Sequence, residues 1–306
     1  MSISTSYYFD QAVRQMGDLQ TSIAKTQTQI STGQQLTKPS DNPDKVNAIA
    51  RLNSAIARQD GYASTLATVG DRLKAEETSI KSASDEMTRV KELAVQAAND
   101  TLSPADRANI SAEIQSIRAD LNALAATRDV NGEYLFSGTR VGQQPFSNGS
   151  NGSTVYQGDR AGIRVSVGDQ RQLTINRAGS QVFSGVVRDD GTKRTQAGFF
   201  QVLDDLANAI KQSDHAGMQH GLGEIDQLNS GLSHALAQNG ADQNVVSSQQ
   251  SLIDETRLRL QATLSGLADA DYTQTITQLQ KQTLGLEAAQ STFAKTSNLS
   301  LFNFLK

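Results

Sequence analysis

The residues that most often do chemistry are sparse in this chain, and they lack the spacing that catalysis needs. The histidines are His215, His220 and His234, and no two stand four residues apart, as they do in the His-Glu-x-x-His helix that binds zinc. The adjacent carboxylates Glu76–Glu77 and Asp204–Asp205 lie in polar helical patterns. Nothing near them indicates the apolar pocket that would separate two carboxyl pKa values for general acid–base work. We expect these side chains to be solvated.

Other site motifs are also missing from the sequence. It contains no Gly-x-x-x-x-Gly-Lys-Ser/Thr loop for phosphates and no Gly-x-Ser-x-Gly nucleophile elbow. With no cysteine, disulfides, thiolate chemistry and most structural zinc sites are excluded. The sequence therefore predicts no catalytic, cofactor-binding or metal-binding residue and no small-molecule substrate. The alternative, an enzyme whose activity lies in a β insertion, is disfavoured by the absent zinc motif.

Composition favours a long molecule with a narrow core. Of 306 residues, 37% are hydrophobic and 5% aromatic, which is little for one compact globule. The formal charge of −4 gives no support to a nucleic-acid surface. The N-terminus lacks the pattern of a cleavable signal, and no stretch reaches the roughly 18 apolar residues of a membrane helix. Ordinary rules would place such a chain in the cytosol, unless it uses an export route without a cleaved signal.

The elements that must position any functional surface are helices at the two ends of the chain. Both terminal segments repeat at steps of four and three residues, which is the seam of a left-handed coiled coil. The predicted seam positions are Phe9, Val13, Met16, Gln20, Ile23, Gln27 and Ile30 in the first segment, and Tyr272, Ile276, Leu279, Thr283, Leu286, Gln290 and Phe293 in the last, with Leu301 and Phe302 beyond them.

The terminal helices are poor in charge, with four charged residues in 1–30 and four in 272–306. A helix that stands alone in water usually carries more ion pairs on its outer face. We therefore expect the predicted seam residues to form a subunit interface, in which the terminal helices pair with each other and with other copies of the chain. No membrane or nucleic-acid partner is expected.

The middle of the chain combines long helices with a β-rich insertion. A helix is predicted from about 44 to 99, and a return helix from Ser103-Pro104 to about 128. Glycine becomes frequent after residue 137, where Ile163–Val167 and Leu173–Ile175 alternate like strands. We predict a mainly α fold: an elongated antiparallel helical rod with a small outer β domain. Its predicted parts are a terminal helix and bend (1–43), rod helices (44–137), the β domain (138–196), returning rod helices (197–269) and the closing helix (270–306).

Motifs in the same order along the chain resemble the flagellin family. The resemblance covers roughly residues 1–138 and 200–306. It rests on Ile3–Ser6, Ser31-Thr-Gly33 with Lys38–Pro43, Glu92–Leu102 with Asp106-Arg107, Asn131–Gly138, and Ala270-Asp-Tyr272 with Ser300–Leu305. The Leu-Phe-x-x-Leu ending and the length are more similar to the hook-associated members of the family than to filament flagellin, which is the alternative.

The resemblance implies a structural role outside the cell. It implies a subunit of the bacterial flagellum that joins hook to filament in a ring of identical copies, through terminal helices that lie innermost and are disordered in the monomer. It also implies type III export without a cleaved signal peptide, and a cytosolic export chaperone. Its expected neighbours are hook-associated protein 1 on the hook side and flagellin or the filament cap on the distal side.

Overall fold

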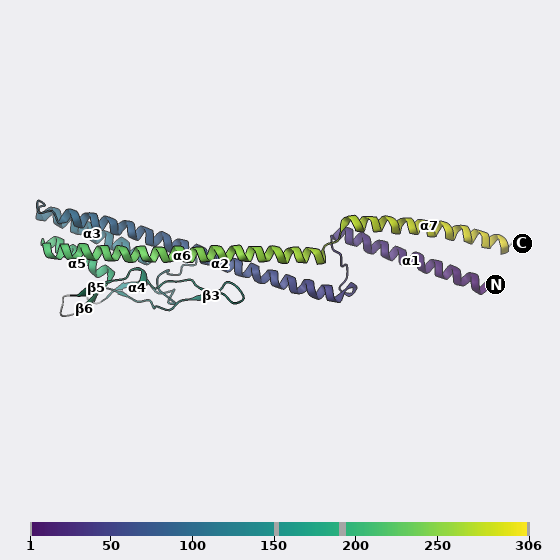
Figure 1. Ribbon diagram of the computed structural model, residues 1–306, viewed down its shortest axis with the longest axis horizontal. Helices are drawn as coiled ribbons and strands as arrows, with labels where there is room; N and C mark the ends of the chain where they lie inside the picture. The colour runs from purple at the N-terminus through teal and green to yellow at the C-terminus, as the bar shows by residue number, and fades with distance from the viewer. Residues whose placement is uncertain (1, 150–152, 190–193, 305–306) are drawn as a thin grey trace. The chain divides into compact units, whose positions relative to one another are not determined.

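The computed structural model describes residues 2–149, 153–189 and 194–304, and it is mainly helical (Figure 1). The helices are α1 (Ser2–Thr32), η1 (Pro39–Asp41), α2 (Pro43–Ala97), α3 (Pro104–Ala125), α4 (Gly179–Val182), α5 (Phe199–Gln212), α6 (His215–Ala268) and α7 (Tyr272–Phe304). The strands are β1 (Phe146–Asn148), β2 (Thr154–Tyr156), β3 (Arg164–Ser166), β4 (Gln172–Thr174), β5 (Val186–Asp189) and β6 (Arg194–Ala197). The predicted mainly α fold with a small β region is confirmed. No described helix is long and apolar enough to cross a membrane.

The chain forms two compact units. We call residues 1–59 and 255–306 the terminal unit and residues 60–254 the middle unit. Both long helices, α2 and α6, contribute residues to each unit. The break near residue 59 falls inside α2, where the sequence offers no Gly or Pro cluster that would have predicted it.

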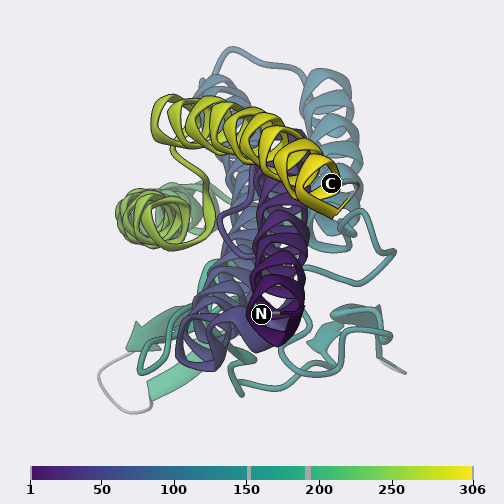
Figure 2. The same ribbon diagram turned by 90° about the vertical axis from the view of Figure 1, so that its right-hand side faces the viewer.

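In the terminal unit, α1 and α7 lie side by side and run in opposite directions (Figures 1 and 2). The bends that follow α1 and precede α7 are joined by an antiparallel bridge between Gln34 and Asp269. Gln35 N–H donates to the Ala268 carbonyl at 2.7 Å, and Ala270 N–H donates to the Gly33 carbonyl at 2.8 Å. Gly33 has a φ of +70°, which glycine adopts without strain. The C-terminal end of α1 and the N-terminal end of α7 are thereby held together at the bends.

The middle unit has one large apolar core that helices and hairpins share. α3 packs along α5, and Met87 of α2 is completely buried among their side chains. Ser103 caps α3: its hydroxyl accepts from Asp106 N–H, and Pro104 stands in the first turn. Ser111 donates to the Ala207 carbonyl at 2.8 Å, which fastens α3 to α5.

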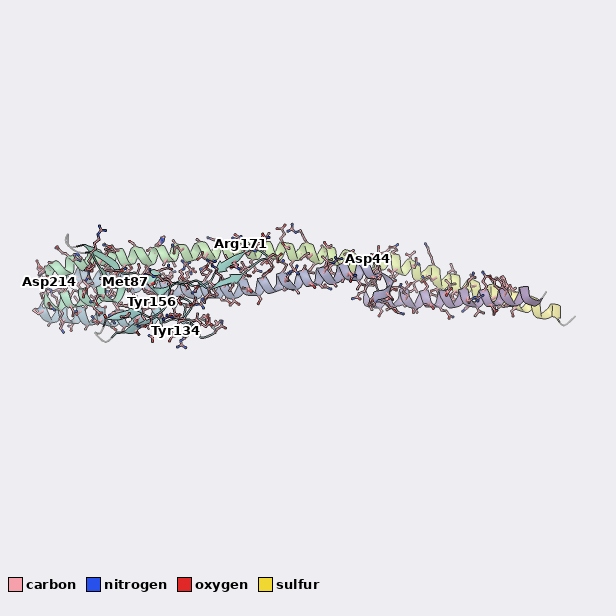
Figure 3. The ribbon with its side chains drawn as sticks, turned by 90° about the horizontal axis from the view of Figure 1, so that it is seen from below. Asp44, Met87, Tyr134, Tyr156, Arg171 and Asp214 are labelled. Carbon is pink, nitrogen blue, oxygen red and sulfur yellow. The ribbon has the colours of Figure 1, made fainter. Side chains whose placement is uncertain are left out.

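The β region consists of three antiparallel hairpins, β1–β2, β3–β4 and β5–β6, within the described residues. Strands of three or four residues cannot enclose a core of their own. The apolar side chains of β1–β2 and β5–β6 instead enter the helical core, where Phe146 contacts Phe200 at a ring distance of 5.2 Å. Val165 and Leu173 of β3–β4 pack against a separate cluster that includes Leu66 and Ile253. Tyr156 is labelled in Figure 3. Its hydroxyl donates to the Asp159 carbonyl at 2.8 Å and accepts from Gly179 N–H at 3.2 Å. The predicted strands at 163–167 and 173–175 correspond to β3 and β4.

Candidate assembly interface

The seam between α1 and α7 is partly aromatic. Phe9 and Phe293 meet edge to face with ring centroids 5.3 Å apart, an arrangement in which a positive ring edge faces a negative ring face. Both side chains remain partly exposed. In a pair of helices, each seam residue is covered by the partner helix on one side only. This seam therefore covers only part of the apolar surface of the two helices.

Farther along the seam lies a layer of hydrogen-bonded polar side chains. Gln282 Nε2 donates to Ser22 Oγ at 2.7 Å, and Thr26 Oγ1 lies 3.0 Å from Gln282 Oε1, to which it donates. Thr26 is only 4% exposed. A buried polar layer of this kind costs stability but fixes the register, because sliding either helix by one turn would leave these groups without partners.

The predicted seam positions divide into two alternating sets. Those partly buried in the terminal unit are Phe9, Met16, Ile23, Ile30, Leu279, Leu286 and Phe293, and those exposed are Val13, Gln20, Gln27, Tyr272, Ile276, Thr283 and Gln290. The structure instead places Ala12, Leu19 and Thr26 in the α1 seam and Thr275, Gln282 and Ala289 in the α7 seam.

The sequence could not choose between these alternatives for a physical reason. On a helix, the residues three and four positions after a given residue both lie close to the face of that residue, one slightly to each side. The position of the partner helix decides which of the two faces it. In the terminal unit Ala12 is partly buried, whereas the predicted position Val13 beside it is exposed.

The exposed set gives the terminal unit an uncovered apolar surface. Tyr272 and Ile276 are 51% and 44% exposed, and Leu284, which the seam prediction did not include, is 67% exposed. These three residues follow a spacing of four and eight along α7, so they lie on one side of that helix. We call them the outer face of α7. Tyr7, Tyr8 and Val13 of α1 are likewise large and exposed. The predicted interface residues Leu301 and Phe302 lie outside the residues whose side chains the structure describes.

The bend between α1 and α2 is held by polar contacts. Asp41 pairs with Lys25 at 3.1 Å and receives the Thr37 hydroxyl at 3.0 Å. The hydrogen bond from Lys25 is the main reason that the pKa of Asp41 lies below its usual value. Lys45 Nζ donates to Gln35 Oε1 at 2.8 Å. The motif Lys38–Pro43, which carries part of the family resemblance, therefore helps to hold the bend between α1 and α2.

Sequence reasoning missed the buried ion pairs of the middle unit. Arg72 Nη1 lies 2.6 Å from Asp129 Oδ2, and both side chains are less than a tenth exposed. Arg188 of β5 donates two hydrogen bonds of 2.6 and 2.7 Å to Glu224 of α6. These bonds are the main reason that the pKa of Arg188 is raised. Each pair joins groups far apart in sequence. The spacing of residues along the sequence therefore does not indicate either ion pair.

The residues considered for chemistry lie in separate places. His215 is 3.3 Å from Asp100, His220 is 3.4 Å from Glu224, and His234 is 2.8 Å from Gln238. Glu76, taken as solvated in the sequence analysis, is instead 2% exposed and lies 2.7 Å from Arg177. Burial raises its pKa, against the opposing effect of the guanidinium. The prediction was wrong because Glu76 faces the inner side of α2, where it meets Arg177 from the segment between β4 and α4.

Comparison with known proteins defines the class to which this architecture corresponds. Residues 3–141 match the model of the bacterial flagellin N-terminal helical region. The resemblance to the flagellin family is therefore confirmed over this N-terminal part of the chain.

Over its whole length, the chain is similar to one kind of flagellar protein in particular. It is 28% identical to flagellar hook-associated protein 3 of Salmonella typhimurium, over 99% of each chain. It is 21% identical to the flagellin of Listeria monocytogenes, over 85% of this chain and 83% of that one. The fold matches a crystal structure of flagellar hook-associated protein 3 from Legionella pneumophila with a TM-score of 0.66, covering 72% of this chain and 98% of that one at 17% identity.

Proposed function

We propose that this protein is the structural subunit that joins hook to filament in the bacterial flagellum, and that it assembles with copies of itself through its terminal helices. The observation that carries the proposal is the full-length similarity to hook-associated protein 3, which exceeds the similarity to the Listeria flagellin in both identity and coverage. Filament flagellin is the second candidate, because the matched N-terminal region is common to both kinds of subunit.

The structure supports different roles for two faces of α7. The seam residues Leu279 and Gln282 hold α7 against α1 within one chain, whereas the outer face of α7 is left for a neighbour. Covering an apolar side chain of this size contributes about 1.5–3 kcal/mol at most. Three such side chains on each copy, repeated around a ring, would give substantial cohesion without any catalytic chemistry.

The proposal extends to location and partners. The protein would leave the cell through the flagellar type III channel without a cleaved signal, with a cytosolic chaperone holding its C-terminal segment beforehand. Hook-associated protein 1 would lie on its hook side and flagellin or the filament cap on its distal side. The support for these partners is the family resemblance and the two kinds of relative named above.

Substitutions on different sides of α7 test the interface. In a bacterium that carries the variant as its only copy, Ile276→Asp places a charge on the outer face, and we expect motility in soft agar to be lost while the purified protein keeps its helical circular dichroism. Thr292→Asp is the matched control: Thr292 is exposed and, sixteen residues away at about 100° per residue, lies on the opposite side of α7. Normal motility of Ile276→Asp would refute the outer face as an interface.

Position in the flagellum separates the two candidate functions. Immunogold labelling of detached flagella should give one band at the distal end of the hook. Labelling along the entire filament would establish the flagellin alternative and reject the junction role.

A further inference from the structure

The formal charge of the chain is divided unevenly between its two units. The terminal unit contains 11 Lys and Arg against 8 Asp and Glu, a formal charge of +3. The middle unit contains 17 basic residues against 24 acidic residues, a formal charge of −7. The modest total of −4 thus conceals two units of opposite sign, and such asymmetry points to an electrostatic role in association.

Part of the positive charge forms an unpaired stripe on α2. Asn47, Arg51, Ser54 and Arg58 are spaced at four, three and four residues, so they share one exposed side of the helix. We call these four residues the α2 stripe. Together with Ala50 they line a shallow, open surface. Arg51 and Arg58 make no ion pair or hydrogen bond with the described residues, and their charge is therefore available to a partner.

The middle unit offers matching negative charge. Asp71, Asp85 and Asp120 are exposed, and they too make no ion pair with the residues that the structure describes. Other surface carboxylates of this unit, such as Glu113, are already paired within the chain, here with Arg89 at 2.8 Å. The unpaired acidic groups remain available in each copy.

We propose that the α2 stripe docks on the middle unit of a second copy of this chain. A terminal unit packed against another terminal unit would set a formal charge of +3 against +3, whereas a terminal unit packed against a middle unit sets opposite charges together. Screening reaches about 8 Å at physiological salt, so these charges act where the surfaces approach and favour the second pairing. A nucleic-acid track would need a longer run of cations than Arg51 and Arg58 provide. The inference rests on the proposed assembly into a ring of copies.

Cross-linking from the stripe identifies what covers it. The chain has no native cysteine, so Ser54→Cys carries the sole thiol for a benzophenone maleimide. Flagella from cells with this variant as their only copy are labelled and irradiated, and the species of twice 32.8 kDa is cut from a gel and digested. We expect cross-linked peptides from residues 60–254 of the second copy. Cross-links confined to residues 1–59 or 255–306, or cross-links to a different protein alone, would overturn the proposal.

Charge reversal gives an independent readout. In flagella washed at increasing NaCl, Arg51→Glu with Arg58→Glu should release roughly tenfold more of this protein at low salt than the parent chain, and the difference should shrink near 0.5 M NaCl. Arg14→Glu with Lys38→Glu makes the same change in charge elsewhere in the terminal unit. Equal release from both variants would show that the stripe has no special role. If the parent chain itself is absent from detached flagella, the proposed assembly role fails, whatever the stripe does.

Discussion

Removing Arg72 should strongly destabilise the middle unit. Arg72 links α2 to the turn at 129–135: it pairs with Asp129 at 2.6 Å and donates to the Tyr134 carbonyl at 3.1 Å. Arg72→Met keeps the apolar stem but leaves the Asp129 carboxylate buried without its counter-charge. Loss of one partner of a buried pair costs about 3–5 kcal/mol. We expect about 3 kcal/mol, because Asp129 Oδ1 keeps hydrogen bonds from the N–H groups of Asn131 and Glu133 at 2.9 and 3.0 Å.

Three further variants test whether the loss of stability comes from the broken ion pair or from the change in side-chain size. Asp129→Asn alone preserves the two backbone hydrogen bonds and should cost about 1–2 kcal/mol. The double variant should lose less than the sum of the two single losses, since the orphaned charge is gone. Arg51→Met is the matched control on the same helix, exposed and unpaired, and should stay within about 0.5 kcal/mol of the parent chain.

The assay is urea unfolding followed by circular dichroism at 222 nm. With a slope of about 2–3 kcal/mol per molar urea, Arg72→Met should lower the midpoint by roughly 1–1.5 M. Additive single losses would show that Arg72 and Asp129 do not act as a pair. A midpoint shift for Arg72→Met no larger than that of Arg51→Met would refute the reasoning from burial altogether.

Two other predictions concern the polar seam and the β region. Gln282→Ala removes two seam hydrogen bonds and leaves buried Thr26 with only its bond to the Ser22 carbonyl at 2.9 Å, so amide hydrogen exchange of α1 should accelerate by about tenfold. Gln282→Leu with Thr26→Val should restore most of the protection, and equal exchange in all three proteins would contradict the register role. In the β region, hydrogen bonds from Thr139 lower the pKa of Asp159 from 3.8. A carboxyl whose folded pKa is lowered stabilises above the unfolded value and loses that effect as pH falls through the folded value. Asp159→Asn should therefore flatten the dependence of the urea midpoint on pH below about 4, and an unchanged slope would contradict it.

The sequence alone determined the elements and their class. Steps of four and three residues between apolar positions identify the long helices, because a helix buries one stripe whatever its partner is. The alternation at Ile163–Val167 and Leu173–Ile175 likewise indicated the hairpin of β3 and β4. The motifs from Ile3–Ser6 to Ser300–Leu305 were sufficient to indicate the flagellin resemblance, and the comparisons confirm it.

Tertiary structure decided which side of each stripe is covered and which charges are buried. The choice of Ala12 over Val13 for the seam depends on where α7 lies, and no property of α1 by itself records that. Glu76 became a buried ion-pair partner because Arg177, about a hundred residues later in the chain, returns to meet α2. The sequence could predict that the terminal helices pair. Only the tertiary structure separated the face that holds α1 against α7 from the outer face of α7. The reason is that adjacent positions on a helix differ in burial only when another element packs against one of them.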